Sequence, residues 1–122
     1  MSENGKTILI IEDEAMICRL MERLLAKAGH EIITAGNGTE GVEKFRARIN
    51  DICLVILDMS LPQMPGAEVL KILRQEKPGV KVLLSTGWQS SEVEAQFTDV
   101  KPDGFLPKPF QSAGLLEKVQ YL

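Results

Sequence analysis

Acidic side chains follow two apolar segments of this chain, at positions where they could bind a metal ion. Glu12, Asp13 and Glu14 follow the first apolar run, and Asp58 follows a later one. Carboxylates held close together repel one another, and a hard divalent cation relieves that repulsion. Mg²⁺ prefers one or two carboxylates, a backbone carbonyl and several retained waters, which this set could supply. We therefore expect Glu12, Asp13 and Asp58 to form a magnesium site if the fold brings them together.

Two further polar positions follow apolar segments: Thr86 after a fourth strand-like run, and Lys108 after a fifth. Each feature alone has an ordinary structural explanation. Acids at a helix start are favoured by the helix dipole, aspartate is common in turns, and a lone threonine or lysine is most often structural or solvated. The conjunction at successive strand ends is what favours a functional site.

Short β-branched runs alternate with helical periodicity along the whole chain, which predicts the elements that must position these residues. Strands are expected at Thr7–Ile11, Glu31–Ala35, Ile52–Leu57, Val80–Ser85 and Gly104–Leu106. Helices are expected at Met16–Ala28, around Val42 to Ile49, at Val69–Leu73, from Ser90 through Phe97, and over Leu115–Leu122.

This alternation predicts an α/β fold: a five-stranded parallel sheet, doubly wound with five helices and flavodoxin-like. The functional crevice of such a sheet lies at the carboxyl ends of its strands. If the strand order is 2-1-3-4-5, the first and third strands are neighbours, and Asp13 and Asp58 come close together. Pro107 after the fifth run indicates an edge strand.

The length and composition predict one globular domain spanning residues 1–122. No apolar run is long enough for a membrane span, and the first residues do not form a signal peptide. The net charge of −3 argues against a nucleic-acid or anionic-membrane partner. Cys18 and Cys53 are interpreted as reduced core residues, which favours a cytoplasmic protein.

The residues at the strand ends resemble the receiver domain of bacterial two-component response regulators, over nearly the whole chain. The resemblance rests on Glu12-Asp13, on the run from Asp58 through Ser60 to Gly66, on Thr86-Gly87 and on Lys108-Pro109-Phe110. The spacing and the strand context agree with the family as well as the residue types do. A chemotaxis-regulator-like receiver is therefore expected.

The resemblance implies a phosphoryl acceptor. Asp58 would take the group from a phosphohistidine on a sensor histidine kinase or a histidine phosphotransfer protein, with Mg²⁺. Asp13 and Asp58 would bind Mg²⁺ through their side chains, Ser60 through its backbone carbonyl and Glu12 through a metal-bound water. Thr86 and Lys108 would each contact a phosphoryl oxygen. These roles supply the nucleophile and the countercharge that phosphoryl transfer needs.

The resemblance also implies that the Lys108-Pro109 peptide is cis and that the module switches. Thr86 would move toward the phosphoryl group, and an aromatic side chain, here Phe105 in place of the commoner tyrosine, would rotate into the vacated space. The output face, for a downstream target still to be named, would combine the helix from Ser90 with the fifth strand and the last helix.

The resemblance further implies that two positions, Ser60 and Trp88, border the path of water to the phosphoryl group. The bulk of Trp88 predicts slow self-dephosphorylation. The chain would thus be a signalling module, not an enzyme acting on other substrates. It would be either a single-domain regulator or part of a larger kinase or regulator.

Two other classes of protein stay open at this point. One is a receiver-shaped interaction module that no longer takes phosphate, although such modules usually lose one of the site residues. The other is a metal-dependent phosphohydrolase or a flavin-binding domain of similar topology. A hydrolase would need a second acid at the position of Ser60, and a flavin site would need Ser, Thr or Gly where Glu12 and Asp13 stand.

Overall fold

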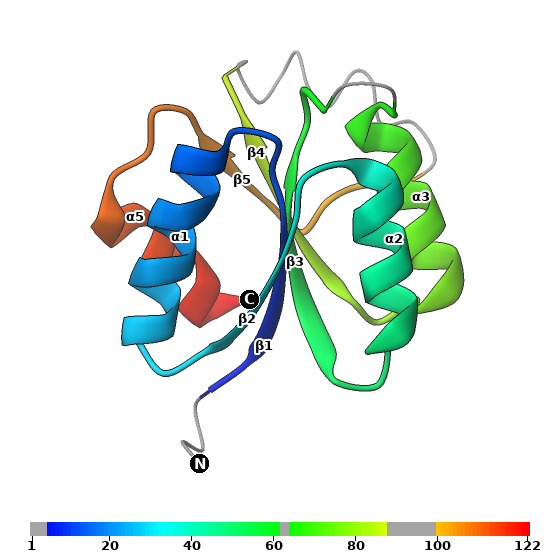
Figure 1. Cartoon of the computed structure of the whole chain (residues 1–122), viewed down its shortest axis with the longest axis horizontal. Helices are drawn as coiled ribbons and strands as arrows, with labels where there is room; N and C mark the ends of the chain where they lie inside the picture. Colours follow the sequence, from blue (N-terminus) through cyan, green and yellow to red (C-terminus); the bar gives the residue numbers. More distant parts are fainter. Residues whose placement is uncertain (1–4, 62–63, 88–99) are drawn as a thin grey trace.

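The fold is a parallel five-stranded sheet in the order β2-β1-β3-β4-β5, flanked by helices (Figure 1). The structure is a computed structural model and describes residues 5–61, 64–87 and 100–122. The strands are β1 (Thr7–Ile11), β2 (Glu31–Ala35), β3 (Ile52–Asp58), β4 (Lys81–Thr86) and β5 (Gly104–Pro107). The helices within these ranges are α1 (Ala15–Lys27), α2 (Gly38–Ala47), α3 (Gly66–Glu76) and α5 (Ser112–Tyr121).

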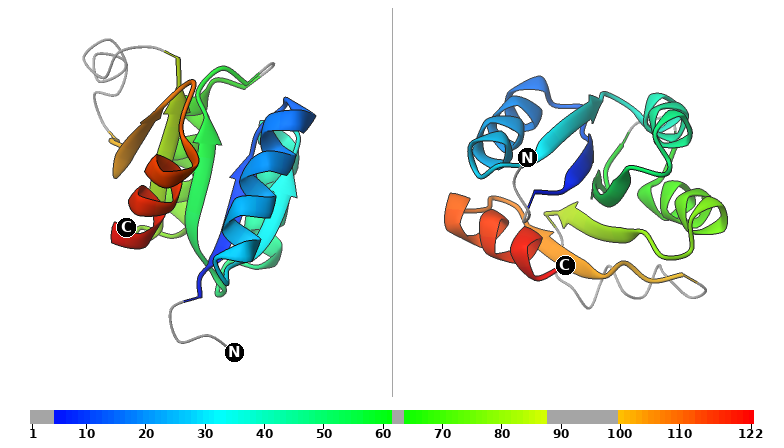
Figure 2. Two further views of the ribbon diagram at one scale, coloured as in Figure 1. Left: turned by 90° about the vertical axis from the view of Figure 1, so that its left-hand side faces the viewer. Right: turned by 90° about the horizontal axis from the view of Figure 1, so that it is seen from below.

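The helices cover both faces of the sheet and bury a separate core on each. Helices α1 and α5 lie on one face, and α2 and α3 lie on the other (Figures 1 and 2). Successive residues of a strand point to opposite faces. Leu9 and Ile11 of β1 therefore pack in the core beneath α2 and α3, whereas Ile8 and Ile10 pack beneath α1 and α5. The apolar runs of the central strands are buried because both of their faces are covered.

Local signals place the ends of two helices. The Asn37 side chain accepts a hydrogen bond from the Glu40 N–H at 2.8 Å, which satisfies a free donor at the start of α2. Gly29 follows the end of α1 with a φ of 100°, a left-handed conformation in which glycine is favoured. The Asn37 cap fixes the start of α2, and the Gly29 turn lets the chain leave α1 and return to the sheet.

The structure confirms the parallel sheet, its strand order and the edge position of the fifth strand. Four of the five predicted helices are present in the described ranges. The helix predicted from Ser90 falls at 88–99, outside the described residues. No helix in the described segments is both long and apolar enough to cross a bilayer.

Both cysteines are free, as predicted, and Cys18 packs against the core beneath α1 and α5, but the interpretation of Cys53 as a core residue was wrong. Cys18 is only partly buried and Cys53 is exposed. The pairing of β1 with β3 shifts register here, because Thr7 pairs with Ile52 and Ile8 with Leu54. Cys53 is left without a partner residue on β1, and a bulge of this kind turns its side chain out of the alternation.

Candidate functional site

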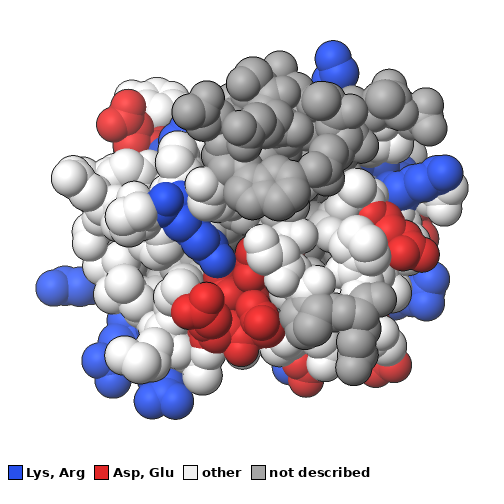
Figure 3. All heavy atoms as spheres, turned by 90° about the horizontal axis from the view of Figure 1, so that it is seen from above, with Lys and Arg blue, Asp and Glu red and all other residues white. Residues whose placement is uncertain are grey.

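The polar residues singled out in the sequence meet at the carboxyl ends of neighbouring strands. Ile11 at the end of β1 pairs with Leu57 of β3, so Glu12 and Asp13 emerge beside Asp58. Figure 3 looks down on this end of the sheet and shows acidic side chains gathered on the face, with a basic side chain reaching toward them. These residues are far apart in the sequence and come together because β1 and β3 are neighbours in the sheet.

Three carboxylates of this cluster could hold a metal ion together. Glu12, Asp13 and Asp58 each offer one oxygen, and these oxygens all lie within 4.8 Å of one another. Glu12 and Asp58 are 2% and 3% exposed, whereas Asp13 is open to solvent. An all-oxygen donor set with one open side suits a hard cation that retains several waters.

Lys108 supplies the positive charge of the site in this structure. Its Nζ donates to Glu12 Oε1 at 3.1 Å and lies 3.4 Å from Asp58 Oδ1. Burial lowers the pKa of Lys108, but the hydrogen bond to Glu12 and the charge of Asp58 outweigh it and raise the pKa above its usual value. The Lys108-Pro109 peptide is cis, as predicted.

Burial dominates the electrostatics of Glu12, and its hydrogen bonds with the Glu14 N–H and Lys108 only partly offset it. Burial raises the pKa of Glu12 from 4.5 to about 7, and Asp58 adds to the increase. The Glu14 N–H, at the start of α1, donates to Glu12 Oε2 at 3.1 Å, and this bond together with Lys108 limits the shift. A divalent cation would lower that pKa, so the residues present fit Mg²⁺.

The loop after β3 orients Asp58. The Ser60 N–H donates to Asp58 Oδ1 at 2.9 Å, and the Met59 N–H donates to the Ser85 carbonyl at 3.0 Å. A Cβ on Gly66 would lie 2.9 Å from Met59 Cα, so only glycine lets the start of α3 approach this loop so closely. Ser60 itself is exposed beside Asp58.

The remaining predicted residues lie at or near the same end of the sheet. Thr86 ends β4 and is buried, and its carbonyl accepts from the Lys108 N–H at 2.7 Å. Phe105 of β5 pairs with Leu84 and packs partly buried on the core beneath α2 and α3. Trp88 lies outside the described residues.

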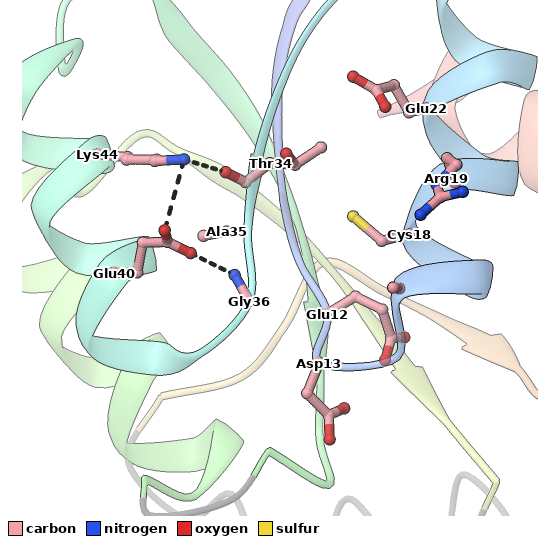
Figure 4. A pocket seen from close by; sticks show the side chains of 11 residues that line it. Glu12, Asp13, Cys18, Arg19, Glu22, Thr34, Ala35, Gly36, Glu40 and Lys44 are labelled. Carbon is pink, nitrogen blue, oxygen red and sulfur yellow. Dashed lines mark hydrogen bonds and ion pairs between the residues drawn. The ribbon is translucent and has the colours of Figure 1, made fainter.

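A pocket of about 290 Å³ adjoins the acidic cluster, and the sequence reasoning did not foresee it. Figure 4 shows it between α1 and α2, with Glu12 and Asp13 at one end. Some of its polar groups bind one another: Lys44 Nζ donates to the Thr34 carbonyl at 2.6 Å, and Glu40 accepts from the Gly36 N–H. The residue pattern of β2 could not have predicted these contacts, because they join side chains of α2 to backbone groups at the edge of the sheet.

Comparison with known proteins identifies the family. The response regulator receiver domain family matches residues 8–120. The chain is 33% identical over 116 residues to the chemotaxis protein CheY of Thermotoga maritima, covering 93% of each sequence. It is 35% identical over 104 residues to the probable transcriptional regulatory protein TcrX of Mycobacterium tuberculosis, which covers 85% of this chain but only 44% of TcrX. The chain thus spans less than half the length of that regulator.

A solved structure agrees with this assignment. The response regulator protein TrrA of Thermotoga maritima, in complex with Mg²⁺-BeF, is 34% identical with a TM-score of 0.82, and the match covers 95% of this chain and 97% of TrrA. Sequence, sheet order and the residues gathered at the strand ends all lead to one family. The chain belongs to the response regulator receiver domains, the signalling modules of two-component systems.

Proposed function

We propose that this chain takes a phosphoryl group onto Asp58 from a sensor histidine kinase or a histidine phosphotransfer protein, in a Mg²⁺-dependent reaction. The observation that carries the proposal is the burial of Asp58 beside Glu12, Asp13 and Lys108. An anionic group can enter this acidic site only if positive charge compensates the carboxylates. A phosphoryl group that binds together with a cation, beside Lys108, is compensated in this way. Residues 1–122 would act as a single domain in the cytoplasm.

In the proposed reaction an Asp58 carboxylate oxygen attacks the phosphorus of the phosphohistidine. The phosphorus–nitrogen bond breaks, the imidazole leaves with the bonding electron pair and takes a proton, and an acyl phosphate remains on Asp58. Lys108 and Thr86 would each contact a phosphoryl oxygen and spread its charge. The acidic cluster makes a cation necessary, because the incoming group is itself an anion.

Glu12, Asp13 and Asp58 would hold the Mg²⁺, with Glu12 acting through water and the Ser60 carbonyl as a further ligand. The bound ion supplies countercharge to the transferring group. The similar TrrA was solved in complex with Mg²⁺-BeF, which supports the binding of Mg²⁺ by this chain. Burial, with a smaller contribution from Asp58, raises the pKa of Glu12, and a bound cation would favour its charged form.

The proposed output uses residues beyond the acceptor. Movement of Thr86 would let Phe105 rotate, altering the face formed by β5, α5 and the segment that includes Ser90, and thereby binding a downstream target. Ser60 and Trp88 would border the water path and give slow self-dephosphorylation. No direct contact with nucleic acid or membrane is proposed, in keeping with the net charge of −3.

The test is incubation with a small-molecule phosphodonor, with and without Mg²⁺, followed by intact-mass and peptide mass spectrometry. The parent is expected to gain one phosphoryl group only with Mg²⁺, and Asp58→Asn none. Asp51→Asn, at an exposed aspartate paired with Arg48, is the matched control and should be modified like the parent. A phosphoryl group on another residue, or modification without metal, would contradict the proposal.

A further inference from the structure

Ser85 in β4 is fully buried, and its hydroxyl has no hydrogen-bond partner among the described residues. Buried polar groups are hydrogen-bonded in the great majority of cases, and one left unpaired destabilises the fold. A hydroxyl in such a place is free to donate a hydrogen bond if a neighbouring acceptor becomes available. Its surroundings show which partner is available.

The sheet places the Ser85 side chain beside Asp58. Ser85 pairs with Asp58 of β3 on one side and with Leu106 of β5 on the other. Paired residues of adjacent parallel strands share a face, and the strands lie about 4.8 Å apart. Leu106 packs in the core beneath α1 and α5, which identifies the face shared by all three side chains.

The Lys108 side chain crosses the strand that carries Ser85. Lys108 follows β5, yet its Nζ lies beside Asp58 of β3, and β4 is the strand between them. The small serine leaves this path open. In this structure Lys108, and not the Ser85 hydroxyl, is the side chain that contacts the Glu12 and Asp58 carboxylates.

We propose that Ser85 is a positioning residue for Asp58. Phosphorylation gives Lys108 a new partner, the phosphoryl oxygen, and removes it from the Asp58 oxygen. The Ser85 hydroxyl then donates a hydrogen bond to the Asp58 side chain and holds it in place. A hydroxyl can do this by rotating about one bond, without backbone movement. The inference rests on the proposed phosphorylation of Asp58 and adds a residue to it.

The test compares Ser85→Ala, Ser85→Cys and Ser85→Thr with the parent, using beryllofluoride as the stand-in for the phosphoryl group. Ser85→Cys keeps the volume but has only a weak donor, and Ser85→Thr keeps the hydroxyl. Ser112→Ala, at the exposed start of α5, is the matched control. Three quantities are measured by calorimetry: the melting temperature without metal, the Kd for Mg²⁺ alone, and the Kd for beryllofluoride at saturating Mg²⁺.

We expect Ser85→Ala and Ser85→Cys to weaken beryllofluoride binding about fivefold, the factor that one net hydrogen bond represents. Their metal-free melting temperature should equal or exceed that of the parent, because an unpaired hydroxyl is removed, and their Kd for Mg²⁺ should change less than about twofold. Ser85→Thr should bind beryllofluoride more tightly than Ser85→Cys. The control should match the parent in all three measurements.

Parental beryllofluoride affinity in both Ser85→Ala and Ser85→Cys would overturn the assignment of Ser85 and leave the proposed function standing. Weaker beryllofluoride binding that is accompanied by a lower melting temperature and an equally weakened affinity for Mg²⁺ would also overturn it, because Ser85 would then be structural. Failure of the parent to bind beryllofluoride with Mg²⁺ would instead overturn the proposed function, and this inference with it.

Discussion

At the scale of single residues, the site is a charge balance among three carboxylates and one lysine. Lys108 Nζ contacts Glu12 and Asp58, the two acids with almost no exposure to solvent. A cation and Lys108 therefore compete for the same oxygens, and a proton on Glu12 is a third competitor. The pKa of about 7 for Glu12 makes that proton relevant at neutral pH.

The affinity for Mg²⁺ should depend on pH because of Glu12. Below about pH 7 the Glu12 carboxyl is protonated, and binding of the ion must release that proton. We expect affinity to fall by up to tenfold per pH unit below this pKa and to level off above it, as linkage to one proton requires. Titration calorimetry at about pH 6, 7 and 8 measures the Kd for Mg²⁺ on both sides of this pKa.

Glu12→Gln is the control for this pH dependence. It should bind Mg²⁺ more weakly, but with an affinity that no longer changes between about pH 6 and pH 8, because the titrating group is gone. Equal affinities of the parent at the two ends of that range would contradict the assignment of the proton to Glu12.

At the scale of elements, the start of α3 packs closely against the loop that follows Asp58 and includes Met59 and Ser60. A Cβ on Gly66 would meet the backbone of Met59, which cannot rotate away as a flexible side chain can. Gly114 in α5 is the opposite case, since a Cβ there would meet no atom within 4 Å. The two glycines therefore offer a matched pair of identical substitutions.

We predict that Gly66→Ala and Gly114→Ala change stability in opposite directions. Gly66→Ala should lower the free energy of unfolding by about 1–3 kcal/mol through overpacking and weaken Mg²⁺ binding by displacing the loop. Gly114→Ala should raise it by up to about 1 kcal/mol, because alanine favours the helix over glycine. Chemical denaturation measures both, and stabilisation by Gly66→Ala would show that α3 does not constrain the loop.

At the scale of the whole molecule, the sheet joins two cores that cannot form independently. Adjacent residues of β1 and β3 alternate between the core beneath α2 and α3 and the core beneath α1 and α5. Loss of either layer of helices would expose one face of the same strands. The acidic site lies at the end of these shared strands and so depends on both cores.

The described parts of the chain should therefore unfold in one cooperative transition. Phe45→Ala on one face and Leu115→Ala on the other should each lower the free energy of unfolding by about 2–5 kcal/mol. In both variants, far- and near-ultraviolet circular dichroism should give coincident transitions. Two separated transitions in either variant would mean that the faces are independent units.

Much of the fold follows from local patterns in the chain. The β-branched run at Thr7–Ile11 and the helical spacing between Met16 and Ala28 depend on near neighbours, and the structure has a strand and a helix there. The acids that follow the first and third strands were also visible as candidates, because a parallel sheet directs such residues to one edge. Cys53 was misjudged because its exposure depends on a register shift against β1.

Residue types, strand and helix segments, and the end of the sheet where the chemistry gathers are all properties of the amino-acid order. The contact between Lys108 and Glu12, which are 96 residues apart, arises only when strand order sets them side by side. The raised pKa of Glu12 likewise comes from burial, as does the Ser85 hydroxyl's lack of a partner among the residues that the structure describes. Burial and long-range contacts depend on which strands become neighbours, and no local pattern specifies that.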